Sequence, residues 1–92
     1  MGRYKWSQQE LVLLGLLREV RMNKGLSGPA VQKKLQRPNS YIAKVEMGEK
    51  RLDILELYEL CQVYEMSLTT FSQMLEQRLN QMEMRTGLDR HH

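Results

Sequence analysis

The residues from 39 to 47 combine side-chain types that could recognise another molecule by contact. On a helical wheel Ile42 and Val45 fall together on one face, while the opposite face is small and polar with one cation. The outward residues are Ser40, Ala43, Lys44 and Met47. Such a helix can anchor through its apolar side and present the other side to the base edges in a DNA major groove. Amphipathic surface helices that bind nothing often show the same pattern.

The flanking sequence predicts how this segment is positioned. Ser27 begins a short helix over about residues 28–35, a tight turn follows, and a second short helix begins near Pro38 or Asn39. Proline suits the start of a helix because a first-turn N–H has no intrahelical partner. Two short helices joined in this way, over residues 27–47, have the outline of a helix-turn-helix motif.

Positive charge is concentrated on this motif and its flanks. Residues 18–51 hold nine Lys or Arg and three Glu, a net charge of +6, whereas residues 52–92 have a net charge of −4. A solvated basic surface is the plain interpretation, but clustering on a segment suited to DNA favours contact with phosphates. The candidate phosphate-contacting residues are Lys24, Ser27, Lys33, Arg37, Tyr41, Lys50 and Arg51.

The remaining sequence predicts a single all-α domain. Ninety-two residues with 41% hydrophobic content suit one small core. We expect a short arm at residues 1–6, the domain at 7–84 with a last helix over about 68–84, and a flexible tail at 85–92.

Two capping boxes predict where helices begin. Ser7 and Glu10 form the first box, with Trp6 as its hydrophobic staple, and open a helix that runs to about Asn23. Asp53 opens a second helix in the same way.

The last helix carries more apolar surface than one core requires. Leu75, Leu79 and Met82 continue its stripe after four helices have already enclosed a core, which predicts a homodimer through this helix. The alternative is that this helix folds back over the first helix, where Leu11 and Val12 also exceed the needs of a core face. Either apolar surface could also bind a protein partner.

The sequence contains no recognisable set of residues for catalysis or metal binding. The histidines are His91 and His92 in the tail, and Cys61 is the single cysteine, so neither a disulfide nor a cysteine-based zinc site can form. There is no paired-carboxylate pocket and no glycine-rich phosphate loop. We expect no enzyme, no cofactor, no metal and no membrane span, and a cytoplasmic location.

The segment LREVRMNKGLSGPAVQKKLQRPNSYIAKVEMGEKRLD resembles the Cro/repressor-type (XRE-like) helix-turn-helix family over roughly residues 14–75. The most specific matches are Lys24-Gly25-Leu26-Ser27, Ser40-Tyr41-Ile42, Lys44-Val45-Glu46 and Gly48-Glu49. The resemblance implies a compact five-helix, lambda-repressor-like domain with an extended C-terminal helix. It also implies a sequence-specific transcriptional regulator, of repressor type, that binds a palindromic DNA operator.

The resemblance assigns roles to individual residues. It implies that Asn39, Ser40 and Lys44 face the groove, and that Arg21 and Glu46 form a structural ion pair between the first and third helices. Two alternatives to a plain repressor stay open. The chain could be an antitoxin-like or controller protein that also binds a partner, or a protein-interaction module that has lost DNA reading.

Three positions depart from the family pattern. The family usually has Gln, which contacts a phosphate and braces the recognition helix, where this chain has Gly28. It usually has Ala at Gln32, where a small residue lets the two motif helices approach, and Gly at Gln36 in the turn. A left-handed backbone at Gln36 is expected to cost roughly 1 kcal/mol relative to glycine.

Overall fold

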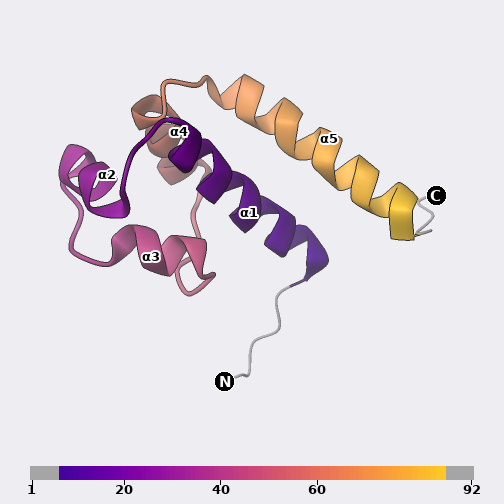
Figure 1. Ribbon diagram of the computed structural model, residues 1–92, viewed down its shortest axis with the longest axis horizontal. Helices are drawn as coiled ribbons and strands as arrows, with labels where there is room; N and C mark the ends of the chain where they lie inside the picture. The colour runs from indigo at the N-terminus through magenta and orange to yellow at the C-terminus, as the bar shows by residue number, and fades with distance from the viewer. Residues whose placement is uncertain (1–6, 87–92) are drawn as a thin grey trace.

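A computed structural model describes residues 7–86 as five α-helices with no strand among them (Figure 1). The helices are α1 Gln8–Asn23, α2 Gly28–Leu35, α3 Tyr41–Glu46, α4 Ile54–Val63 and α5 Leu68–Thr86. The all-α class and the number of helices agree with the sequence prediction. The arm at 1–6, the Trp6 staple and the tail from Gly87, with both histidines, lie outside the described residues.

Both predicted capping boxes are present. The Ser7 Oγ accepts the Glu10 N–H at 3.0 Å, and Glu10 Oε1 accepts the Ser7 N–H at 2.9 Å. At α4 the corresponding distances between Asp53 and Glu56 are 2.8 and 2.9 Å. Each box satisfies two backbone N–H groups that a helix start leaves without partners, so local sequence fixes these two boundaries.

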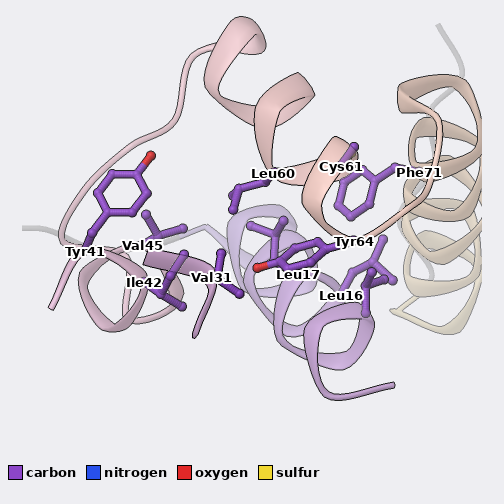
Figure 2. Packing of buried hydrophobic residues seen from close by; sticks show 11 residues of the cluster. Leu16, Leu17, Val31, Tyr41, Ile42, Val45, Leu60, Cys61, Tyr64 and Phe71 are labelled. Carbon is purple, nitrogen blue, oxygen red and sulfur yellow. The ribbon is translucent and has the colours of Figure 1, made fainter. Parts of the chain in front are cut away.

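The core unites the helix-turn-helix motif with the other helices (Figure 2). Tyr64 and Phe71 are its largest fully buried side chains, each 1% exposed or less, and Tyr41 lies at one edge of the cluster with Phe71 at the other. The motif contributes Val31, Ile42 and Val45, and α1 and α4 contribute Leu16, Leu17, Val20, Leu60 and Cys61. Because α3 shares this core, its orientation is fixed by packing against elements that come before it and after it in the sequence.

The third helix begins later than the sequence predicts. It starts at Tyr41, whereas a start near Pro38 or Asn39 was expected. Ser40 has φ 72°, a left-handed conformation that a helix cannot pass through, and its side chain makes no capping hydrogen bond. Asn39 and Ser40 therefore lie in the turn that leads into α3, and the helix itself has six residues.

The fifth helix lies alongside α1 and reaches Thr86, two residues beyond the expected end of the domain (Figure 1). Arg78 donates two hydrogen bonds to the Glu19 carboxylate, at 2.9 and 2.8 Å. Leu75 packs against the core, and Met82 lines a groove of about 530 Å³ between the two helices. Leu75 is therefore used within the domain, whereas Leu11 at the groove stays 53% exposed, so the choice between a dimer and a folded-back helix remains a prediction.

Candidate nucleic-acid interface

The two faces of α3 are separated as the helical wheel predicts. Tyr41, Ile42 and Val45 are buried, at 8%, 2% and 1% exposure. The outward side chains of Ala43, Lys44 and Met47 are exposed, and Asn39 and Ser40 are exposed in the preceding turn. The structure thus brings all five predicted base-reading residues to the outside of one short segment.

Gln32 holds α3 against α2, which the sequence did not predict. Its side chain is 7% exposed, and its Oε1 accepts the backbone N–H of Ile42 at 3.0 Å. That N–H is in the first turn of α3, where no intrahelical partner exists. A buried N–H left without a partner costs about 1–3 kcal/mol, so this amide both positions and stabilises the helix.

Gly28 faces α3 at Ile42, the residue whose backbone N–H bonds to Gln32. A Cβ atom at Gly28 would stand 3.5 Å from the Cβ and Cγ2 of Ile42, an ordinary van der Waals distance, so this position packs against Ile42 and has room for a Cβ. Gly28 and Gln32 are one helical turn apart and share a face of α2. Relative to the pattern of the resembling family, the small residue and the bracing amide have exchanged places. The four-residue spacing was the signal in the sequence that could have revealed the exchange.

The turn between α2 and α3 contains a strained residue. Gln36 has φ 57° and ψ 45°, the left-handed conformation that favours glycine. Its N–H bonds to the carbonyl of Lys33, and the next residue, Arg37, bonds to the carbonyl of Gln32 at 2.9 Å. These bonds close the end of α2 in spite of the missing glycine, so the turn keeps its sharp path.

Arg21 and Glu46 join α1 to the end of α3. Arg21 Nε and Nη2 donate to the two carboxylate oxygens of Glu46 at 2.7 and 3.0 Å, and Nη1 donates to the Leu26 carbonyl at 2.9 Å. The two side chains are only 14% and 11% exposed. The hydrogen bond to Glu46 raises the pKa of Arg21. A bidentate pair this sheltered fixes the angle of α3 relative to α1.

Arg37 and Tyr41 are held by the protein itself. Arg37 Nη2 donates to Glu59 on α4 at 2.6 Å, and its guanidinium lies 5.3 Å from the centre of the Tyr41 ring. The hydrogen bond to Glu59 raises the pKa of Arg37, and burial raises the pKa of Tyr41. Both were predicted to contact phosphate, but these contacts make them first of all a link between the turn and α4.

Three further predicted phosphate cations also face carboxylates. Lys24 is 3.1 Å from Glu65, and Lys50 is 3.2 Å from Glu56. The third, Arg51, pairs with Glu10 in the first turn of α1. Exposed pairs of this kind contribute only about 0–1 kcal/mol, so a phosphate can replace the carboxylate. Within residues 7–86, Lys33 and Lys44 form no ion pair, and Ser27 caps α2 by accepting the Ala30 N–H at 3.2 Å.

An apolar surface that the sequence did not predict lies on α4. Ile54, Leu55 and Tyr58 are 62%, 70% and 47% exposed. They lie in the first two turns of the helix, whereas the buried residues Leu60 and Cys61 lie in its later turns. Among the described residues there is also no group of side chains suited to holding a metal ion, and none of the described helices is long and apolar enough to cross a membrane.

Comparison with known proteins places this geometry in a known fold. No protein family's sequence profile matches the chain, and no curated protein matches it by sequence. The crystal structure of the restriction-modification controller protein C.Esp1396I is similar, with a TM-score of 0.72 and 22% identity, over 80% of this chain and 97% of that one. A point mutant of the same protein gives 0.72 and 20%, over 82% and 95%. The likeness confirms the all-α, five-helix class.

Proposed function

We propose that this protein is a sequence-specific DNA-binding transcriptional regulator of repressor type. The observation that carries the proposal is the outward face of α3, which is exposed while Gln32 and the Arg21–Glu46 pair hold the helix rigidly from behind. Recognition of base edges in the major groove requires a rigid helix with small exposed side chains and with cations around it. The similar solved protein is named a controller, which accords with a regulatory role. Acting on DNA, the protein would work in the cytoplasm.

Base contacts and phosphate contacts come from different parts of the surface. Asn39, Ser40 and Lys44 would meet base edges, with Ala43 and Met47 beside them. Lys33, together with Lys50 and Arg51 after release of their carboxylate partners, would meet the phosphates. Ser27 and Lys24 would approach the backbone at the edge of the same surface. Phosphate contacts supply affinity and base contacts supply specificity.

A homodimer on a palindromic operator completes the proposal. One six-residue reading helix touches only a few base pairs, whereas two copies related by a two-fold axis read half-sites about 34 Å apart. Leu75, Leu79 and Met82 on α5 are half-buried, so their remaining exposed area can meet its own copy. The exposed apolar surface of α4 provides a second candidate for the same contact.

The direct test is selection of binding sites from a random DNA pool by the purified full chain. We expect a palindromic sequence to be enriched and to bind at least a hundredfold more tightly than random DNA at near-physiological salt, because specific binding typically exceeds non-specific binding by about 10³–10⁷. Equal affinity for selected and random DNA at two salt concentrations would remove the proposal.

A second candidate function rests on the apolar surfaces. The α4 patch, Ile54, Leu55 and Tyr58, and the groove between α1 and α5 are suited to a protein partner, as an antitoxin-like or controller protein would need. If the selection yields no preferred DNA, a protein-interaction module becomes the better interpretation.

A further inference from the structure

The outward face of α3 has an unusual chemistry for a DNA reader. Of its exposed side chains within the helix and at its cap, Ala43, Lys44 and Met47, only Lys44 carries a strong hydrogen-bonding group. Met47 is 58% exposed, and its backbone N–H donates to the Ala43 carbonyl at 2.9 Å. Ala43 and Met47 are therefore one turn apart on the same face, and together they form an apolar strip beside a single cation.

The edges of the bases in the major groove offer one partner for an apolar strip. Each base pair presents hydrogen-bond donors and acceptors there, and thymine alone among the four bases adds a methyl group. Resting on the proposed function, we propose that Ala43 and Met47 read the C5-methyl groups of thymines, while Lys44 beside them contacts a guanine. The half-site recognised by this protein then combines thymine methyls with a guanine.

The geometry of α3 sets the spacing of those methyl groups. Residues four apart are separated by about 6 Å along a helix axis, at about 1.5 Å per residue. Successive base pairs are about 3.4 Å apart, so two methyl groups contacted by Ala43 and Met47 lie roughly two base steps from each other. Ile42 and Val45, buried behind the strip, prevent α3 from rotating to present another face.

Met47 suits this role better than a rigid side chain would. Its unbranched thioether has three rotatable bonds and can adapt to a methyl group approached from several angles. Exposure alone does not identify such a role, because Met22 on α1 is exposed to nearly the same extent, 56%. Met22 therefore provides a matched control of the same residue type on another helix.

The experiment uses the site selected from random DNA and compares it with copies in which single thymines are replaced by deoxyuridine, which lacks the methyl group. Wild-type affinity should fall about fourfold for each contacted methyl, the factor that corresponds to about 0.8 kcal/mol per buried methyl-sized group. Met47→Ala should lose this discrimination at one thymine only, and Met22→Ala should keep it everywhere. Circular dichroism of both variants establishes that they fold alike.

The possible results distinguish failure of methyl recognition from failure of the proposed DNA binding. A selected site that binds equally well with deoxyuridine at every thymine overturns methyl reading while leaving DNA recognition intact. Discrimination that survives unchanged in Met47→Ala also overturns it, since another residue then reads the methyl. A pool without any enriched sequence removes the proposed function, and methyl reading with it. Discrimination lost in Met47→Ala but kept in Met22→Ala supports the inference.

Discussion

Gln32 shows how one side chain can support a reading helix from behind. Its carbonyl oxygen accepts an N–H from the first turn of α3 in a site that is 7% exposed to solvent. Only an acceptor at this depth can serve that N–H, because water cannot reach it. The amide is thus a positioning group for the residues that we propose to contact DNA, although it does not itself lie on the outward face.

Replacement of Gln32 by Met should therefore destabilise the fold. Met keeps the volume but offers no oxygen, so the buried N–H of Ile42 is left unpaired at a cost of about 1–3 kcal/mol. Urea unfolding measures the loss, with Gln62→Met on the exposed side of α4 as control. Equal losses in the two variants would show that the amide contributes nothing.

A double variant, Gly28→Gln with Gln32→Ala, recreates the arrangement of the resembling family. It should be more stable than Gln32→Met, because the new amide can accept the N–H of Ile42.

Glu46→Ala tests the other support of α3. It leaves the Arg21 guanidinium, 14% exposed, without its carboxylate, and breaking a buried pair typically costs about 3–5 kcal/mol. We expect a loss toward the lower end, because both side chains retain some exposure. Thermal unfolding of Glu76→Ala, at an exposed position of α5, gives the comparison. Similar unfolding temperatures for the two variants would contradict a structural role for the pair.

At the scale of elements, helix starts marked by nearby capping residues could be predicted from the sequence, whereas contacts between distant residues could not. The starts of α1 and α4 were predictable because the capping side chains are three residues from the groups they bind. The start of α3 was not predictable, because Ser40 has a left-handed backbone and no capping hydrogen bond, so no local capping signal marks the boundary. The Arg37–Glu59 pair spans 22 residues, a separation at which sequence spacing carries no information.

The two parts of the proposed interface should respond differently to mutation. Lys44→Ala should change the preferred sequence, because a lost base contact costs about 1–3 kcal/mol at one position. Lys50→Ala should weaken binding to all sequences about equally and lower the salt slope by about one unit. Titrations of selected and random DNA at two salt concentrations separate the effects. An unchanged ratio of specific to random affinity in Lys44→Ala would place the reading elsewhere.

The contact between α5 and α1 should weaken in acid. The hydrogen bond from Arg78 lowers the pKa of Glu19 below its ordinary value near 4.5. Since the folded-state pKa is the lower one, the pair stabilises the fold fully above the ordinary value and loses this effect as pH falls through the folded-state pKa. The difference in stability between wild type and Arg78→Gln should shrink over that window. A difference that stays constant down to pH 3 would mean that the pair is not formed in solution.

At the scale of the whole molecule, the open question is which surface joins two copies. We expect a homodimer at micromolar concentration, measured by sedimentation. Leu79→Glu with Met82→Glu should dissociate it if α5 forms the interface, and Leu55→Glu with Tyr58→Glu provides the matched test of α4. Buried like charges facing each other across a two-fold axis are strongly unfavourable. A wild-type monomer contradicts the dimer, and dissociation only by the second pair moves the interface to α4.

The buried position of Cys61 gives the molecule a chemical reporter of its own opening. It is the chain's single cysteine, it lies 1% exposed in the core beside Leu60 and Tyr64, and burial raises the pKa of its thiol. Alkylation requires a thiolate that the reagent can reach, so the folded protein should react only when the core opens. The rate of labelling then counts opening events in native buffer, without denaturant. If the proposed DNA binding holds, labelling in the presence of the selected site should be slower in proportion to the strength of binding.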